Sequence, residues 1–147
     1  MILKNGITGF YENFDDIKNS ISSQGFIQFC NELVYNNQGK ILAVDLELTG
    51  KNFYYCKMQF QKKICYVLLN ASYPYVVFAS LVSMEKITYI DKPDYMEYVP
   101  DNYFVLNREE LKMDFENSKN QLNRIEWKQI LYWKPKTVGE IIFNFWD

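Results

Sequence analysis

The chain of 147 residues has the length of one ordinary domain, so we expect a single continuous domain over residues 1–147. It contains no histidine, which excludes a Ser-His-Asp or Cys-His catalytic arrangement and any histidine-ligated zinc site. A net charge of −2, with two arginines against fourteen lysines, argues against direct binding of nucleic acid.

The first predicted element is a helix over residues 15–35, with Asp15 or Asp16 as its N-cap. Its apolar residues recur at the i, i+3, i+4, i+7, i+8 spacing of one buried face, namely at Phe26, Phe29, Cys30, Leu33 and Val34. Gly25 weakens the middle of the segment, so two short helices are an alternative. Gly39 suits the left-handed position that ends a helix.

From residue 40 the apolar pattern changes to a period of two, which is typical of strands. We expect strands over residues 40–48, 53–60 and 64–70, followed by one bent strand or two over residues 75–90. The connections are too short for parallel crossovers, which need a dozen or more residues. The spacing therefore predicts an antiparallel β-meander sheet of about four to six strands.

After a loop over residues 91–103, Asn107 and Glu110 form a capping box that predicts a second helix. Its expected apolar stripe is Leu111, Phe115, Leu122 and Ile125. Alternating apolar residues predict a further strand over residues 125–133. A second capping box, Thr137 with Glu140, predicts a last helix through Phe145. The predicted fold class is thus α+β, with an N-terminal helix and C-terminal helices packed against the sheet.

The last fifteen residues are rich in aromatic side chains, and Phe143, Phe145 and Trp146 lie within five residues of the final one. We expect this tail to dock on the core or on a partner, since a free chain end is usually polar and frayed.

The tail follows the pattern W-x-P-x-T-x-G-[DE]-x-[IV]-F-N-x-[WF]-D. The residues that match it are Trp133, Pro135, Thr137, Gly139, Glu140, Ile142, Phe143, Asn144, Trp146 and Asp147. This ending resembles that of cytoplasmic immunity proteins from bacterial contact-dependent growth inhibition and related polymorphic toxin systems, over about a tenth of the chain. The resemblance implies a non-enzymatic protein that binds and neutralises a cognate toxin C-terminal domain, with a nuclease as the expected toxin. We expect the tail pattern itself to be mainly architectural.

Acidic residues gather between residues 91 and 116, where eight acids stand against three bases. One interpretation is a solvated loop followed by a polar helix face, and the other is an acidic surface that attracts a basic partner. Tyrosines in the loop would add the aromatic anchors of a tight protein interface. The candidate partner-binding residues are Asp91, Asp94, Tyr95, Glu97, Tyr98, Asp101, Tyr103, Glu109, Glu110 and Asp114. Among the tyrosines, Tyr95, Tyr98 and Tyr103 are expected to be the most exposed.

Other candidate sites have simpler explanations. Asp45 and Glu47 could act as a carboxylate pair, but a solvated strand face accounts for them without a third ligand. Tyr54, Tyr55 and Tyr66 could stack on bases, but cross-strand packing is favoured because no arginine is interleaved. Three cysteines without CxxC spacing indicate free thiols in a reducing compartment. No cofactor is expected.

The opening residues show no secretion signal, and no segment approaches the roughly 18 apolar residues of a membrane span. The expected location is therefore the cytoplasm, with a protein partner and no direct contact to nucleic acid or membrane. Two alternatives stay open: an interaction module unrelated to toxins, and a small histidine-free enzyme. The sequence leaves open the toxin's identity, the mode of inhibition and the oligomeric state.

Overall fold

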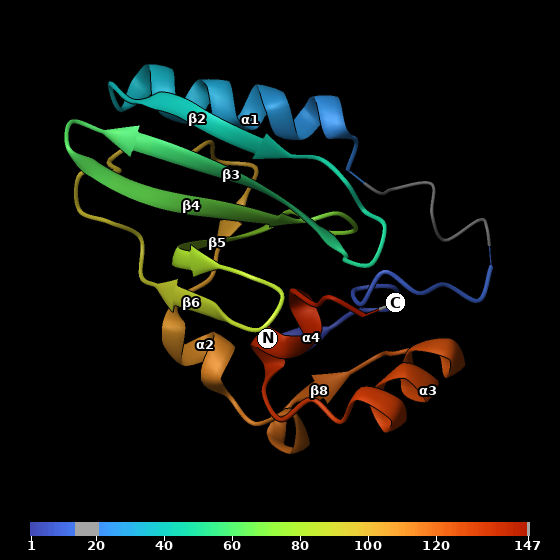
Figure 1. Ribbon diagram of the computed structural model, residues 1–147. Coiled ribbons are helices and arrows are strands. Elements are labelled where there is room, and N and C mark those ends of the chain that lie inside the picture. The colour runs from blue at the N-terminus through green and yellow to red at the C-terminus, as the bar shows by residue number, and fades with distance from the viewer. Residues whose placement is uncertain (14–20, 147) are drawn as a thin grey trace.

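In the computed structural model a twisted sheet lies between helix α1 on one side and the C-terminal helices on the other (Figure 1). The structure describes residues 1–13 and 21–146. The predicted α+β architecture, an antiparallel meander with an N-terminal helix and C-terminal helices, is confirmed.

Five consecutive strands form the meander, each antiparallel to the next. They are β2 (Lys40–Asp45), β3 (Phe53–Phe60), β4 (Lys63–Asn70), β5 (Tyr75–Val82) and β6 (Ile87–Ile90). Residues 75–90, predicted as one bent strand or two, form the two strands β5 and β6. A turn separates them, in which Ser83 and Lys86 exchange backbone hydrogen bonds. β2 ends at Asp45, three residues earlier than predicted, and contains an irregularity between Ile41 and Ala43.

Three very short strands escape sequence analysis because two residues carry no periodicity. β7 (Phe104–Val105) pairs in parallel with the start of β5. β1 (Ile2–Leu3) and β8 (Lys119–Asn120) form a separate parallel pair that joins the N-terminal segment to the chain before α3.

One face of the sheet, termed the α1 face, packs against helix α1 (Ser23–Asn36). The predicted apolar stripe is confirmed, with Phe26, Phe29, Cys30 and Leu33 buried and Val34 partly buried. Cys56 on β3 and Cys65 on β4 lie on neighbouring strands.

The start of α1 differs from the prediction. Ser22 caps the helix by accepting a hydrogen bond from the Gly25 backbone N–H at 3.0 Å. Gly25 therefore lies in the first turn, where a glycine interrupts nothing, and the helix is continuous to Asn36. The predicted caps Asp15 and Asp16 lie outside the described residues.

The opposite face, termed the C-terminal face, is covered by α2 (Arg108–Lys112), α3 (Arg124–Trp133) and α4 (Val138–Ile142). Their buried side chains pack against Phe53, Leu68 and Val77 of the sheet. The predicted Asn107–Glu110 capping box is confirmed, with hydrogen bonds of 2.9 and 3.1 Å. The apolar stripe expected beyond it is wrong in extent, because α2 ends at Lys112 and a short 3₁₀ helix, Phe115–Asn117, follows.

The strand predicted over residues 125–133 is wrong, since this segment is helix α3. Asn123 and Glu126 form a capping box at its start, with hydrogen bonds of 2.9 and 3.1 Å. Helical geometry then buries Glu126 and Ile130, four residues apart, on one face. The alternation of apolar residues reflects exposed side chains here rather than a sheet.

Helix α4 begins as predicted, because the Thr137 hydroxyl accepts a hydrogen bond from the Glu140 N–H at 3.3 Å. The capping box is incomplete, since the Glu140 carboxylate instead accepts from the Lys136 N–H at 2.7 Å. The helix ends at Ile142, three residues before the predicted end at Phe145.

The aromatic tail docks on the core. Phe143 is buried and meets the Phe53 ring edge-on, with ring centroids 5.8 Å apart. Trp146 is also buried and stacks on Trp133, with centroids 6.4 Å apart and an interplanar angle of 3°. Asp147, the last residue of the tail pattern, lies outside the described residues.

Three buried asparagines join the tail to the sheet and to the N-terminal segment. The side-chain amides of Asn52 and Asn70 each donate hydrogen bonds to the carbonyls of Ile7 and Ile142, at 2.7 to 2.9 Å. The Asn144 N–H donates to the Asn52 side-chain oxygen at 2.8 Å. Because buried polar groups are costly when unpaired, this network fixes three distant segments in one arrangement.

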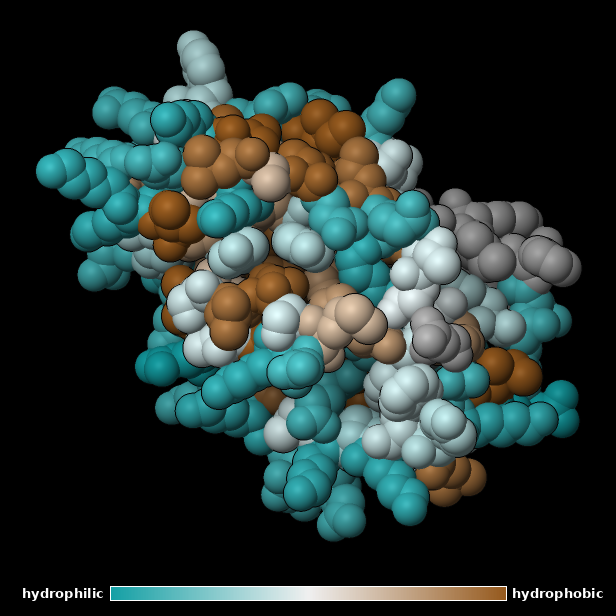
Figure 2. Space-filling model, in the orientation of Figure 1, coloured by the Kyte–Doolittle hydropathy of each residue, from teal (hydrophilic) through white to brown (hydrophobic). Residues whose placement is uncertain are grey.

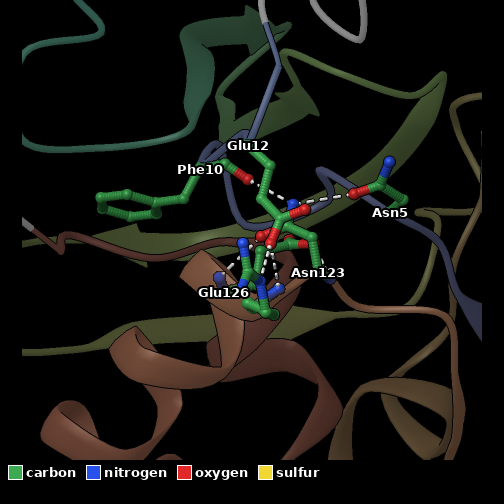
Figure 3. Close-up of polar contacts among 6 residues, drawn as sticks. Asn5, Phe10, Glu12, Asn123 and Glu126 are labelled. Atoms are coloured by element: carbon green, nitrogen blue, oxygen red, sulfur yellow. Dashed lines mark hydrogen bonds and ion pairs between the residues drawn. The ribbon is translucent and has the colours of Figure 1, made fainter.

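A buried carboxylate joins the N-terminal segment to α3 in the same way. Glu126 accepts hydrogen bonds from the N–H groups of Gly6 (2.8 Å) and Thr8 (3.0 Å) and from the Thr8 hydroxyl (2.6 Å). Figure 3 shows Glu126 and its capping partner Asn123 at the start of α3, and Asn123 reaches on to Asn5 and Phe10.

Gly139 in α4 allows a close approach to α2 and to the sheet. A Cβ at this position would lie 3.0 Å from the Leu111 carbonyl oxygen and 3.2 Å from the Tyr89 ring. We expect Gly139→Ala to lower the free energy of unfolding by about 1–3 kcal/mol, because backbone must shift to admit the methyl group. Urea denaturation measures this change.

Gly25→Ala is the matched control for Gly139→Ala. A Cβ added at Gly25 would have side-chain atoms of Ser22 and Ile21 as its nearest neighbours, at 3.3 and 3.6 Å. This variant should be neutral or more stable by up to about 1 kcal/mol, since alanine is the better helix former. Equal effects of the two substitutions would contradict the close approach of α4 to α2.

Candidate partner-binding surface

Loop 91–103 leaves β6 and returns through β7 to the start of β5, crossing the α1 face on the way. Met96 is fully buried in the same core cluster as α1, and Val99 packs against this cluster. A turn begins at each proline of the loop: the Pro93 carbonyl accepts a hydrogen bond from the Met96 N–H, and the Pro100 carbonyl accepts one from the Tyr103 N–H. The loop is thus a cover for the part of the sheet that α1 leaves open.

The loop is fastened to the end of α1 by two reciprocal hydrogen bonds. The Tyr98 N–H donates to the Asn37 side-chain oxygen at 3.0 Å, and the Asn37 amide donates to the Tyr98 carbonyl at 2.8 Å. Within the loop, the Lys92 ammonium donates to the Met96 carbonyl at 2.7 Å. These contacts, with the burial of Met96, hold the backbone of the loop in place.

The prediction that the three loop tyrosines are the most exposed is wrong: Tyr98 is 40% exposed, less than Tyr35 (85%) and Tyr132 (76%), and the other two are partly buried. Tyr95 packs on Phe60, with ring centroids 5.4 Å apart. Tyr103 meets Phe29 edge-on at 4.3 Å. Burial raises the pKa of both the Tyr95 and the Tyr103 hydroxyl. Both rings complete the core beneath the loop, so they anchor it instead of projecting from it.

The acids of the loop project outward. Asp94, Glu97 and Asp101 are exposed, and none of the three forms an ion pair with a residue in the ranges 1–13 and 21–146. Glu97 and Tyr95 line a depression of about 310 Å³ together with the end of α1 and the β3–β4 turn. Asp94, Glu97 and Asp101 thus place three exposed carboxylates on a well-packed loop backbone, with Lys63 beside Tyr95 at the depression, and the loop needs no further ordering to present them.

The remaining candidates do not join this group. Asp91 accepts a hydrogen bond from the Arg108 N–H at 2.9 Å and lies 3.5 Å from its guanidinium, so it ties the loop to α2. Glu109 lies within α2 and Asp114 just after it; both are exposed, but α2 packs on the C-terminal face through Leu111. Glu110, from the capping box, also belongs to α2. The ten predicted residues are therefore divided between the two faces of the sheet.

Two exposed apolar regions are absent from the predicted site. On α3, Leu131 is 72% and Tyr132 76% exposed, and Trp127 and Trp133 lie nearby on the same helix. On the edge strand β2, Leu42 and Val44 are also exposed. The capping box at Asn123 was the sequence signal for α3, and recognising it would have identified the exposed side of that helix.

The other candidate sites are explained by local packing. Asp45 forms an ion pair with Lys51 at 2.9 Å, and Glu47 accepts hydrogen bonds from Thr49 in the β2–β3 connection. Burial is the largest single influence on the pKa of Asp45 and raises it, but the hydrogen bonds from Lys51 and from the Glu47 N–H, together with the Lys51 charge, outweigh burial and lower the pKa. Tyr55 and Tyr66 are cross-strand neighbours, with ring centroids 6.2 Å apart.

Within the described part of the chain, no group of three or more Cys, Asp or Glu residues is placed to hold a metal ion. Cys30, Cys56 and Cys65 are buried free thiols, and burial raises the pKa of Cys65 to about 11. None of the described helices has the length and apolar character needed to cross a membrane.

Comparison of the chain with known protein families, with curated proteins and with solved structures finds no match.

Proposed function

We propose that this protein is a cytoplasmic immunity protein that binds a cognate bacterial toxin domain and blocks its active site or substrate groove. The observation that carries the proposal is the exposed acidic surface formed by Asp94, Glu97 and Asp101 on loop 91–103, whose backbone is anchored to the end of α1. We name these three residues, together with the exposed Tyr98 between them, the acidic loop surface.

An acidic loop surface suits a partner that acts on nucleic acid. Such a partner exposes lysine and arginine side chains to neutralise phosphates. Carboxylates on an anchored loop would compete for the same basic residues and accelerate encounter by electrostatic attraction. Tyr98 offers an aromatic side chain of the kind that anchors tight interfaces.

The tail resemblance supports the same function from a different part of the chain. Its residues have structural contacts here: Gly139 admits α2, Asn144 belongs to the asparagine network, and Trp146 stacks on Trp133. Because the residues of the tail pattern have structural roles, the pattern identifies a fold, and the residues that contact a toxin can differ between proteins that share it. The toxin-binding residues are then expected outside the tail, in agreement with the acidic loop surface.

Co-expression with the toxin C-terminal domain encoded by the gene immediately upstream tests the proposal. We expect cells that express the domain alone to stop growing, and cells that also express this protein to survive and to yield a stable one-to-one complex. A toxic domain that is neither bound nor neutralised would overturn the proposal. So would a harmless domain that does not bind.

The exposed side of α3 favours a second candidate, an interaction module with a partner unrelated to toxins. Leu131 and Tyr132 present apolar surface away from the acidic loop surface, and such surface often marks a protein contact. A partner captured by the wild-type chain but lost with Leu131→Lys, with toxin protection intact, would assign α3 to this separate role.

A further inference from the structure

The free edge of the sheet carries apolar side chains. In the part of the chain that the structure describes, β2 pairs with β3 alone, so every second residue of β2 directs its backbone N–H and C=O groups away from the sheet. Leu42 is 41% and Val44 38% exposed on this strand. Figure 2 shows hydrophobic side chains gathered over β2.

Edge strands in monomeric proteins usually carry lysine or proline in their middle, or lie under another element. Between Lys40 and Asp45 the sequence is Ile-Leu-Ala-Val, with neither a charge nor a proline. The register shift between Ile41 and Ala43 is of the kind that can protect a sheet edge, but here it leaves Leu42 and Val44 exposed. The edge is therefore open to pairing with another strand.

The neighbouring side of α1 also carries exposed apolar side chains. Helix α1 runs antiparallel to β2 (Figure 1). The 14 residues of α1 span about 21 Å and the six residues of β2 about 20 Å, so the two elements match in length. Ile27 is 36% and Tyr35 85% exposed, and they are eight residues apart, which places their side chains about 80° apart around the helix. Figure 1 shows α1 beside β2 at the same edge of the molecule.

We propose that β2 and this side of α1 form an interface with a second copy of the same chain. The two β2 strands would pair antiparallel about a two-fold axis perpendicular to the sheet and make one continuous sheet. Such an interface must be complementary to itself. The charges of β2 meet this condition, because exposed Lys40 at one end would face Glu47 of the second copy and Asp45, which also pairs with Lys51 of its own chain.

The same two-fold axis places the helices at packing distance. Helix α1 lies over β2 and β3, whose axes are about 4.8 Å apart, so its own axis is about 5 Å from the two-fold axis. The two α1 helices would then be about 10 Å apart and antiparallel, at the upper end of the usual separation of packed helices. Antiparallel packing brings Ile27 of each copy near Tyr35 of the other.

A second copy explains both exposed regions at once. An unrelated strand would satisfy the backbone of β2 but leave Ile27 and Tyr35 in water. The acidic loop surface stays accessible in the dimer, because loop 91–103 meets α1 on its other flank, through Asn37 and Phe29. The dimer would present two such surfaces.

Sedimentation velocity of the full chain, from about 1 to 200 μM, tests the proposal. We expect a monomer–dimer equilibrium in which Val44→Lys and Ile27→Lys each raise the dimer Kd about tenfold or more. Leu131→Lys is the matched control, since it places the same charge at an exposed apolar site on α3 and should leave the Kd unchanged. A monomer at every concentration would overturn the proposal, as would a dimer sensitive to Leu131→Lys alone.

A crosslinking experiment gives a second readout that does not depend on disrupting the interface. The three native cysteines are buried, so Ala43→Cys adds an exposed thiol next to the expected two-fold axis. A short bismaleimide should link two Ala43→Cys chains efficiently and two Leu131→Cys chains poorly. A dimer that links through position 131 and not through position 43 would place the interface elsewhere.

Discussion

Glu126→Ala is expected to lower the free energy of unfolding by about 3–5 kcal/mol, a large part of the stability of a domain this size. The Glu126 side chain is fully buried and accepts hydrogen bonds from Gly6, Thr8 and Asn123. Alanine would leave these donors buried and unpaired, and would also leave a cavity. Urea denaturation with a thermal melt measures the loss, and the Tm should fall by about 10 °C or more.

Glu110→Ala provides the matched control, because Glu110 occupies the same capping-box position at the start of α2. It is only half-buried, and water can replace its single backbone contact with Asn107. The expected loss is about 0.5–1 kcal/mol. Similar losses for Glu110→Ala and Glu126→Ala would contradict the role of Glu126 in fixing the N-terminal segment on α3.

The combined substitutions Asp94→Lys, Glu97→Lys and Asp101→Lys are expected to slow association with the toxin domain about tenfold or more. Reversal of three exposed charges replaces attraction of a basic partner by repulsion, and such changes act chiefly on the association rate. Stopped-flow or surface-based kinetics at low and physiological salt measure the effect, and protection of cells should fall with it. Stability should change little, since all three side chains are exposed and unpaired within the described residues.

A control variant with the same change in net charge distinguishes electrostatic attraction by the loop from a general effect of net charge on association. The control combines Glu85→Lys, Glu109→Lys and Glu116→Lys, which are exposed acids outside loop 91–103. We expect this control to bind and protect nearly as well as the wild type. Unchanged kinetics for the loop variant, or equal losses for both variants, would rule out the acidic loop surface as the contact.

The elements that could be predicted are those whose period is visible locally. The stripe from Phe26 to Leu33 identified the buried side of α1, and alternation with short turns identified the meander. The strand prediction for residues 125–133 is wrong because apolar residues alternate there as regularly as in a strand. Only the capping box at Asn123 and Glu126 distinguishes it as a helix.

The sequence predicted the acidic character of the candidate surface but not how its residues are arranged in space. Sequence located the acids between residues 91 and 116, yet it could not show that Met96 is buried beneath them. The anchor between Asn37 and Tyr98 spans 61 residues, and the bond from Thr8 to Glu126 spans 118. Contacts over such separations leave no periodic signal in one sequence, so the division of the predicted site between two faces became visible only in the fold.

The most direct test of the central claim is amide hydrogen exchange of the full chain, alone and bound to the cognate toxin domain. If the acidic loop surface is the contact, backbone amides of residues 91–103 should gain protection on binding, with smaller changes at the end of α1. Protection confined to α3 or to the tail, with residues 91–103 unchanged, would contradict the proposed binding surface.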